Sequence, residues 1–368
     1  MPLESGIVGL PNVGKSTLFS ALTHMKVPTA AYPFTTVEPN VGMVPVPDPR
    51  LTGISAILKP EKVIPTSLRV VDIAGLIKGS HRGEGLGNQF LAQIREVDAV
   101  IHVVRCFTND QVSHISDTLD PVRDIGIVET EIILKDLETV TQRMERISRK
   151  VRLGDKMAVR EKEFLERLTR KLNDGIPARK LEFQEDEAAT LGKLFLISRK
   201  PVLYVGNENE EDATSHHPKR ETRALLRWAE EEGESVLILS ATLEQELAFL
   251  DTEDERKFFM EEWGLGSTGL ERLVQEAYTL LNLVTFFTTE SNYAQAWTVK
   301  RETPAVQAAG VIHSDFERGF IKVEVYRSED LFAHGSVSAL RELGLIHTHG
   351  RDYIIQDGDV VKFHFRAT

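Results

Sequence analysis

The stretch Gly9-Leu10-Pro11-Asn12-Val13-Gly14-Lys15-Ser16 has the spacing of a phosphate-binding P-loop. In this motif two glycines let backbone N–H groups surround a phosphate, the lysine reaches the β- and γ-phosphates, and the final hydroxyl binds Mg²⁺. The apolar residues 5–8 can form a strand before it, and residues 16–22 can begin a helix after it, as the motif requires. The sequence therefore predicts a nucleotide site with contacts from Asn12, Val13, Gly14, Lys15, Ser16 and Thr17.

The cysteine content and hydropathy point to a soluble protein of a reducing compartment. Cys106 is the only cysteine among the 368 residues. One thiol forms neither a disulfide framework nor a cysteine-based zinc site. The sequence shows no signal-like region and no apolar run of membrane-spanning length. We expect a cytoplasmic protein of two or three domains with no membrane partner.

The charge is unevenly distributed along the chain. Its 44 Lys or Arg and 56 Asp or Glu give a net charge of −12, which argues against a nucleic-acid coat protein, and no DNA partner is expected. Residues 143–180, however, hold thirteen Lys or Arg and six Asp or Glu, a net charge of +7. This basic segment is a candidate contact surface for RNA or another polyanion. The alternative is an ordinary solvated helical face.

Short apolar runs suited to strands recur along the chain, at residues 6–10, 41–46, 68–71, 99–104, 201–205 and 235–239. Helical patterns lie between several of these runs. This alternation is typical of an α/β fold with a doubly wound, mainly parallel sheet.

The alternation breaks between the fourth and fifth runs, where apolar residues follow a heptad spacing on one long helix: Ile133, Leu137, Val140, Met144, Ile147 and Val151. Residues 153–155 can turn the chain, and a return helix is offered by Met157, Phe164, Leu168 and Leu172. We therefore predict an inserted antiparallel α-helical coiled-coil hairpin over residues 129–199. We expect its apolar seam to pack within the chain; a groove for a partner is the alternative.

A third region begins near residue 282. Its expected strands cover residues 284–288, 296–299, 319–325, 353–355 and 360–365, and its expected helix covers residues 336–343. It is a small mixed β domain without a catalytic constellation, and its scattered histidines make a poor metal site. The expected domains are thus a nucleotide domain at 1–128 and 200–281, the hairpin at 129–199, and a C-terminal domain at 282–368.

Two further segments have the features of nucleotide switches. The proline-bounded segment 32–40 contains Thr35 and Thr36, and a threonine that joins Mg²⁺ only beside a γ-phosphate reports the nucleotide state. Thr36 is the first choice, although an ordinary loop threonine pair is the alternative. Asp72 follows a buried apolar run and can hold the metal, and Gly75 can offer its N–H to the γ-phosphate. The expected metal ligands are Ser16, Thr36 and Asp72.

The residue after Gly75 is Leu76, where many signalling GTPases have a glutamine that orients the attacking water. Leucine forms no such hydrogen bond, so we expect slow intrinsic turnover with another group positioning the water. His81 and His114 lie on segments that can approach the γ-phosphate, and His114 is the candidate catalytic residue. A structural role is the alternative for a lone histidine. The expected catalytic set is His114, Lys15 and Gly75.

Base selection is expected in the loop Asn207-Glu208-Asn209-Glu210, where guanine binders carry Asn-Lys-x-Asp. Glu208 lacks a lysine stem, and Glu210 is one methylene longer than the aspartate that binds guanine. Asn207 and nearby backbone can serve the 6-amino group and N1 of adenine. The segment Ser240-Ala241-Thr242 resembles a loop that supports the base, although its hydroxyls can equally cap a helix.

Together these residues resemble the YchF subfamily of Obg-related P-loop proteins, the Obg-like ATPases. The similarity covers essentially the whole chain, and its most specific matches are residues 9–17, 32–40, 72–91, 207–210 and 309–320. The resemblance implies ATP binding with Mg²⁺, slow ATP hydrolysis, GTP as a poorer ligand, and a C-terminal β-grasp-like TGS domain. It also implies association with the ribosome or its RNA and a catalytic role for His114. Glu208 departs from the family, which commonly has a small apolar residue there.

Three functions compete at this point. The first is a nucleotide-switch enzyme that hydrolyses ATP slowly and binds the ribosome through the basic hairpin and the C-terminal domain. The second is a ribosome-associated GTPase that prefers GTP. The third is a protein-binding module whose nucleotide only stabilises one shape.

Overall fold

The computed structural model describes residues 4–25, 40–73, 86–109, 112–113, 118–213, 218–290 and 292–366. It divides into two compact units. The first comprises Met1–Leu22, Asn40–Gly42 and Val70–Gly269, and the second comprises Thr23–Pro39, Met43–Arg69 and Leu270–Thr368. Residues 43–69 therefore group with the C-terminal residues, whereas the sequence had suggested that they belong to the nucleotide domain. Within the described residues, no helix is long and apolar enough to cross a membrane.

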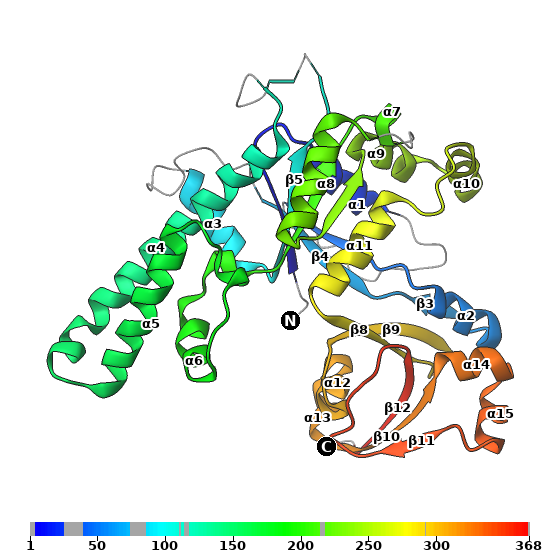
Figure 1. Ribbon diagram of the computed structural model, residues 1–368. Coiled ribbons are helices and arrows are strands. Elements are labelled where there is room, and N and C mark those ends of the chain that lie inside the picture. Colours follow the sequence, from blue (N-terminus) through cyan, green and yellow to red (C-terminus); the bar gives the residue numbers. More distant parts are fainter. Residues whose placement is uncertain are drawn as a thin grey trace. The chain divides into compact units, whose positions relative to one another are not determined.

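The first six-stranded sheet has the order β2-β4-β1-β5-β6-β7, and Figure 1 labels its strands β4 and β5. Its strands are β1 (Glu4–Val8), β2 (Val41–Pro45), β4 (Ser67–Asp72), β5 (Ala99–Arg105), β6 (Val202–Asn207) and β7 (Val236–Leu239). The pairs β1–β5, β5–β6 and β6–β7 are parallel, which confirms the doubly wound, mainly parallel α/β sheet. All seven residues of β5 are buried, as expected for a central strand. The neighbouring helices are α1 (Lys15–His24), α3 (Leu86–Glu96), α7 (Glu210–Ala213), α8 (Arg220–Glu232), α9 (Ala241–Phe249) and α10 (Glu253–Glu262).

The register aligns the carboxyl ends of the central strands. Arg105 at the end of β5 pairs with Asn207 at the end of β6, and Asn207 pairs with Leu239 at the end of β7. The P-loop follows the carboxyl end of β1 at the same edge. In open α/β sheets ligands bind outside the carboxyl ends of the strands, so the loops there form the candidate site.

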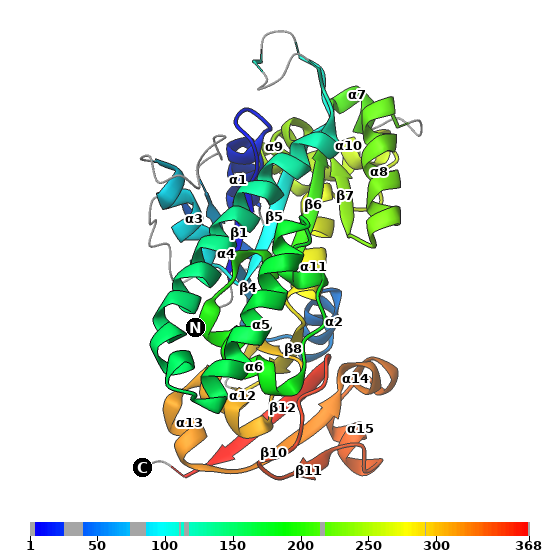
Figure 2. The same ribbon diagram turned by 60° about the vertical axis from the view of Figure 1, so that its left-hand side comes forward.

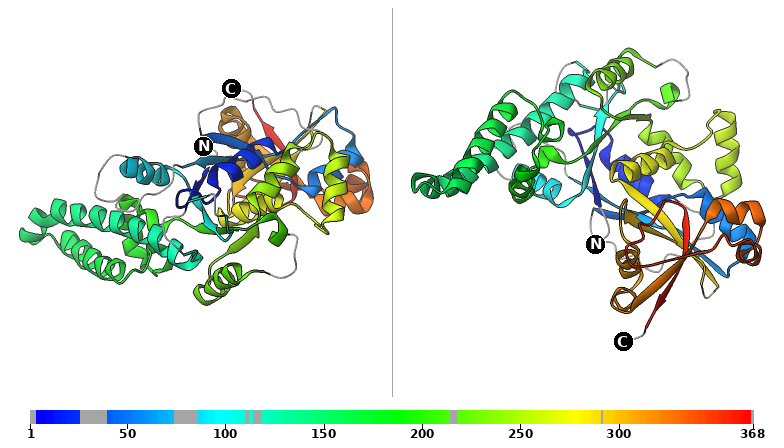
Figure 3. Two further views of the ribbon diagram at one scale, coloured as in Figure 1. Left: turned by 90° about the horizontal axis from the view of Figure 1, so that it is seen from above. Right: turned by 60° about the horizontal axis from the view of Figure 1, so that its bottom comes forward.

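The helical insertion forms an antiparallel hairpin of α4 (Pro121–Arg152) and α5 (Lys156–Asn173). Figures 2 and 3 show the two helices side by side, with α6 (Glu185–Leu194) beside them. Asp120 caps α4 and Asp155 caps α5. The expected seam packs within the chain, where the buried members Ile133, Val140, Ile147, Phe164, Leu168 and Leu172 form one apolar cluster. Met157 does not belong to this seam, because its side chain is 72% exposed near the turn.

A second part of the insertion completes this cluster. Residues 178–199 contain η2 (Ala178–Lys180), α6 and η3 (Ile197–Arg199). Leu191 and Leu194 of α6 join the hairpin core. The buried carboxylate of Asp136 accepts hydrogen bonds from the backbone N–H groups of Ile197 and Ser198, both at 2.8 Å. The return segment is thereby attached to α4 by polar as well as apolar contacts.

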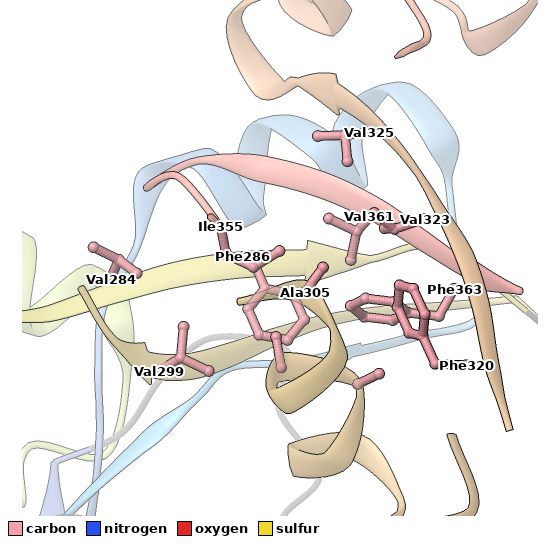
Figure 4. Packing of buried hydrophobic residues seen from close by; sticks show 12 residues of the cluster. Val284, Phe286, Val299, Ala305, Phe320, Val323, Val325, Ile355, Val361 and Phe363 are labelled. Atoms are coloured by element: carbon pink, nitrogen blue, oxygen red, sulfur yellow. The ribbon is translucent and has the colours of Figure 1, made fainter. Parts of the chain in front are cut away.

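The second unit is built on a mixed six-stranded sheet of order β11-β10-β12-β8-β9-β3. Its strands are β3 (Lys62–Ile64), β8 (Leu283–Thr288), β9 (Tyr293–Lys300), β10 (Phe320–Arg327), β11 (His347–His349) and β12 (Asp359–Phe365). Figure 4 shows Phe286, Phe320 and Phe363 in its core together with Ala305 of α12. The helices are α2 (Pro49–Leu58), α11 (Gly269–Leu280), α12 (Ala305–Ile312), α13 (Ser314–Arg318), α14 (Ser328–His334) and α15 (Val337–Glu342).

This unit differs from the expectations in several features, because α12, α13, α14 and the short strand β11 are not among the elements expected there. The segment 353–355 is not a strand; it forms only an isolated bridge between Pro304 and Ile354. The segment 43–69 contributes α2, which packs through Leu51 and Ile54 against a second apolar cluster of this unit. Polar contacts attach it as well, because the guanidinium of Arg50 in α2 donates to Asp357 at 2.7 and 3.1 Å.

Candidate nucleotide-binding site

The P-loop has the backbone conformation that its glycines permit. Gly9 and Gly14 have φ angles of 151° and 100°, and Asn12 is left-handed with φ 62°. A Cβ at Gly9 would lie 2.4 Å from the backbone oxygen of Val103, so only glycine fits. Asparagine is the non-glycine residue that best tolerates the left-handed region, which explains its place at position 12.

Lys15 lies at the start of α1 and is only 8% exposed. Its Nζ donates to the backbone oxygen of Leu10 at 2.7 Å, which closes the P-loop on itself. Burial lowers the pKa of Lys15 to about 8, and the nearby charge of Asp72 opposes this shift. A phosphate group would supply the counter-charge that this buried ammonium needs.

Ser16 and Asp72 meet although 56 residues separate them. The Ser16 hydroxyl donates to Oδ2 of Asp72 at 3.0 Å. Burial raises the pKa of Asp72, while the Ser16 hydrogen bond and the Lys15 charge lower it. Two oxygen ligands beside a P-loop are the donor set that Mg²⁺ prefers, so these residues fit the metal that the motif implies.

Asn207 connects two loops of the site. Its Nδ2 donates to the backbone oxygen of Val13 at 2.9 Å, and its Oδ1 accepts from the backbone N–H of Ala241 at 2.8 Å. A Cβ at Gly14 would lie 2.3 Å from Nδ2 of Asn207, so this approach also requires glycine at position 14. Asn207 is therefore a buried brace between the P-loop and the 240–242 segment, a task that the sequence did not indicate.

The next residues of the base loop have different environments. Glu208 is buried, and its carboxylate accepts from the hydroxyl of Thr222 in α8 at 3.0 Å. Burial raises the pKa of Glu208, and the Thr222 hydrogen bond opposes this shift. Asn209 is partly buried, and Glu210 is exposed at the start of α7. Asn209 and Glu210 therefore lie nearer to solvent than Glu208.

The segment after β7 shows the capping role, one of the two roles that the sequence left open. Ser240 is the N-cap of α9, and its hydroxyl accepts from the N–H of Leu243 at 3.4 Å. Ala241 meets Asn207 through its backbone, and Thr242 is exposed in the first helical turn. The serine caps a helix, as its alternative interpretation states, and the backbone of Ala241 holds the side chain of Asn207.

The loop after β5 also reaches the P-loop. Nδ2 of Asn12 donates to the hydroxyl of Ser113 at 3.1 Å and to its backbone oxygen at 3.3 Å. Sequence reasoning missed Ser113 because serine in a polar loop carries no motif. Its position directly before His114 was the one available signal.

Several expected site residues lie outside the described residues. They are Thr35, Thr36, Gly75, Leu76, His81 and His114. Thr17 is described and partly buried in the first turn of α1. In the described part of the chain, no three His, Cys, Asp or Glu side chains gather into a metal site, so the histidines of the second unit gain no support as ligands.

Comparison with known proteins agrees with this architecture. Residues 4–143 match a family model described as "50S ribosome-binding GTPase", and residues 283–366 match the YchF-GTPase_C model, described as "Protein of unknown function (DUF933)". The chain is 44% identical to "Ribosome-binding ATPase YchF" of Bacillus subtilis and 43% identical to the protein of that name from Escherichia coli O157:H7, each over 100% of both chains.

A solved structure, "Structure of the Schizosaccharomyces pombe YchF GTPase", is also similar to this chain. It matches with a TM-score of 0.88 and 34% identity, covering 98% of this chain and 97% of that one. The similarity thus extends over the nucleotide sheet, the helical hairpin and the C-terminal unit. The chain belongs to the YchF family of P-loop proteins.

Proposed function

We propose that this protein binds ATP with Mg²⁺ at the P-loop, hydrolyses it slowly, and associates with the ribosome. The observation that carries the nucleotide part is the hydrogen bond between Ser16 and Asp72 beside the buried ammonium of Lys15. The names of the bacterial relatives, "Ribosome-binding ATPase YchF", support the substrate and the partner. A ribosomal partner puts the protein in the cytoplasm.

In this proposal Ser16 and Asp72 hold Mg²⁺, and Thr36 joins them when a γ-phosphate is bound. The metal, when bound, neutralises charge on the phosphate oxygens. Lys15 contributes a fixed positive charge, and the backbone N–H groups between Asn12 and Thr17 bind the phosphates. Burial makes Lys15 a stronger partner for phosphate than a solvated lysine would be.

The hydrolytic step is proposed to be slow because Leu76 has no polar group to orient water. Gly75 offers its N–H to the γ-phosphate, and His114 positions the attacking water. Phosphate release by His114→Ala tests this role. A fall of at least tenfold at unchanged ATP affinity supports it, and unchanged turnover removes His114 from the mechanism.

The sequence of the base loop favours adenine over guanine, because the loop lacks the residues of a guanine clamp. A guanine clamp needs a lysine whose stem lies over the base and a short carboxylate that accepts from the N1–H and 2-amino groups of guanine. Position 208, where the clamp has its lysine, is glutamate in this chain. Glu208 is engaged by Thr222, and Asn207 by Val13 and Ala241. We propose that Asn209 and the backbone of residues 207–210 recognise adenine, with Ser240, Ala241 and Thr242 supporting that loop.

Paired calorimetric titrations with ATP and GTP test the base preference. We expect ATP to bind at least tenfold tighter than GTP. GTP binding tenfold tighter would instead favour the GTP-preferring alternative, which the fission-yeast structure's description as a GTPase keeps open.

The ribosome contact is proposed to lie on the tip of the hairpin. Residues 146–160 hold six Lys or Arg and one Asp, and all six cations are exposed: Arg146, Arg149, Lys150, Arg152, Lys156 and Arg160. None of the six forms an ion pair with another described residue. Some cations nearer the base of the hairpin are paired, Arg143 with Glu161 at 2.6 Å and Lys162 with Glu166 at 3.3 Å. Unpaired cations are free to replace the counterions of a phosphate backbone.

The tip also exposes apolar side chains. Leu153 is 78% exposed and Met157 is 72% exposed. This combination suits ribosomal RNA, whose phosphates take the cations and whose unstacked bases offer flat apolar faces. We include the C-terminal residues 282–368, the TGS-like unit, as a second contact with the ribosome.

Co-sedimentation with ribosomes tests the tip. Arg149→Gln with Arg152→Gln should weaken binding at least fivefold and lower its salt dependence. Arg223→Gln with Arg227→Gln, two exposed arginines of α8, makes the same change in net charge and serves as the matched control. Equal weakening by both pairs would show that only net charge matters.

A further inference from the structure

Arg105 ends strand β5 and is only 4% exposed. Its Nε donates to the backbone oxygen of Phe107 at 3.1 Å, and its Nη2 donates to that of Asn109 at 3.2 Å. Its Nη1 donates to the backbone oxygens of Val112 at 3.1 Å and Ser113 at 3.4 Å. The guanidinium also lies 4.4 Å from the centre of the Phe107 ring. One buried side chain thus gathers four carbonyls of the β5 loop, which we define as residues 106–109 and 112–113.

The chemistry of this cluster requires arginine. A planar guanidinium carries five N–H donors that point in fixed directions and serve several carbonyls at once, whereas lysine has one small ammonium. Among the described residues, the Val112 N–H also donates to the Asn109 oxygen at 3.2 Å, and the Cys106 N–H donates to the Asn207 oxygen at 2.8 Å. Arg105 thus holds four carbonyls of this loop by side-chain hydrogen bonds.

The same loop contacts the phosphate-binding motif at its other side. The backbone oxygen of Ser113 accepts from Arg105 and also from Nδ2 of Asn12, at 3.4 and 3.3 Å. The Ser113 hydroxyl accepts from the same Nδ2 at 3.1 Å. Asn12 has the left-handed backbone, φ 62°, that shapes the P-loop. A single residue, Ser113, thus lies between the buried guanidinium and the phosphate-binding backbone.

We propose that Arg105 is a positioning residue for hydrolysis: it holds the β5 loop against Asn12 and thereby fixes the P-loop geometry in which the terminal phosphate is cleaved. This inference rests on the proposed nucleotide hydrolysis. Lys15 closes the loop independently through Leu10, and Asn207 braces it through Val13, so nucleotide binding persists without Arg105. The rate of cleavage is more sensitive, because a misplacement of about 1 Å costs on the order of 100-fold in rate.

Arg105→Lys tests the proposal, because it keeps the positive charge and removes the planar guanidinium with its several N–H donors. We expect kcat for ATP to fall at least tenfold while the Kd for ATP changes less than threefold. Arg179→Lys is the matched control. Arg179 is another largely buried arginine with several hydrogen bonds, to Glu129, Tyr204 and Glu234, but it does not contact the β5 loop. It should leave kcat within threefold at a temperature where both variants are folded.

A double variant tests the connection through Ser113. Asn12→Gly removes the side-chain amide and keeps the left-handed backbone accessible. Combined with Arg105→Lys, it should lower kcat no further than the more damaging single change, because both break one connection. Fully additive losses, or an unchanged kcat in Arg105→Lys, would overturn the inference. A variant that loses ATP affinity while its kcat stays unchanged would also overturn the inference.

Amide hydrogen exchange separates this inference from the proposed function. Exchange at Val112 should accelerate at least tenfold in Arg105→Lys and remain unchanged in Arg179→Lys. If the wild-type protein does not hydrolyse ATP, the proposed function fails and the rate claim fails with it. The exchange result then still decides whether Arg105 holds the loop, and unchanged exchange contradicts that as well.

Discussion

The side-chain amide of Asn207 donates to the backbone oxygen of Val13 at 2.9 Å, so the end of β6 braces the P-loop across 194 residues of sequence. The same side chain accepts from Ala241 at 2.8 Å. One amide thus connects the phosphate-binding loop, the base loop and the start of α9. Because donor and acceptor are both used, the position requires an amide.

Asn207→Asp is expected to weaken nucleotide binding at least tenfold. Aspartate keeps the acceptor for the Ala241 N–H, but its second carboxylate oxygen faces the backbone oxygen of Val13. Two acceptors then meet without a donor between them, which costs about 1–3 kcal/mol. Calorimetric titration with ATP measures the effect. Asn173→Asp, the same change at an exposed position at the end of α5, controls for the added charge; equal losses in both would contradict the brace.

Gly14→Ala is expected to abolish tight nucleotide binding. The new Cβ would lie 2.3 Å from Nδ2 of Asn207, and φ at this position is 100°. Gly154→Ala is the matched control, because its φ of 78° is also positive but no neighbour lies within 4 Å of the added Cβ. It should bind ATP normally. Normal binding by Gly14→Ala would show that the P-loop adapts without cost.

Nucleotide affinity is expected to fall as the pH rises above about 8, the pKa to which burial lowers Lys15. The free protein then loses the ammonium proton, whereas the bound phosphate favours the charged form. Binding therefore takes up a proton in this range, and the affinity falls by up to about tenfold per pH unit. Calorimetry at pH 8.5 in buffers of different ionisation enthalpy measures this uptake. Absence of proton uptake would contradict a depressed Lys15 pKa.

Asp72→Asn is expected to raise the Mg²⁺ concentration needed for half-maximal hydrolysis by about tenfold or more. Asparagine can still accept from the Ser16 hydroxyl, but it lacks the charge that a hard cation favours. Asp98→Asn provides the same chemical change at a carboxylate that accepts from the Glu4 N–H. Its Mg²⁺ dependence should equal that of the wild type.

Leu165→Ala in the hairpin core is expected to destabilise the protein by about 2–5 kcal/mol, because this side chain is fully buried. Met157→Ala, at the exposed tip, should change stability by less than about 0.5 kcal/mol. Urea unfolding followed by helical circular dichroism compares the two. A similar midpoint for both variants would show that the seam contributes little.

The sequence predicted those parts of the fold that local patterns encode. The P-loop spacing located β1 and α1, and heptad spacing from Ile133 to Val151 located the hairpin. Met157 departs from the expected seam because it lies in the first turn of α5, where its side chain is exposed. The sequence predicts a strand at residues 353–355 because Tyr and Ile suit strands. Their backbone instead bonds to Thr303, before α12, and to Ala305, within it.

Long-range partners explain what sequence reasoning missed at the site. The grouping of α2 with the second unit depends on contacts such as Arg50 with Asp357, which lie 307 residues apart. The environments of Asn207 and Glu208 depend on Val13 and Thr222, which no spacing rule connects to them. Residue types indicated a nucleotide site, but only the fold shows which of them brace it.

The most direct test of the central claim is Mg²⁺-dependent phosphate release from ATP by the full-length wild-type protein and by Lys15→Met. The account predicts slow release by the wild type, a loss of at least 100-fold in Lys15→Met, and no release by either without Mg²⁺. Release that persists in Lys15→Met, or that does not depend on Mg²⁺, would contradict hydrolysis at this P-loop.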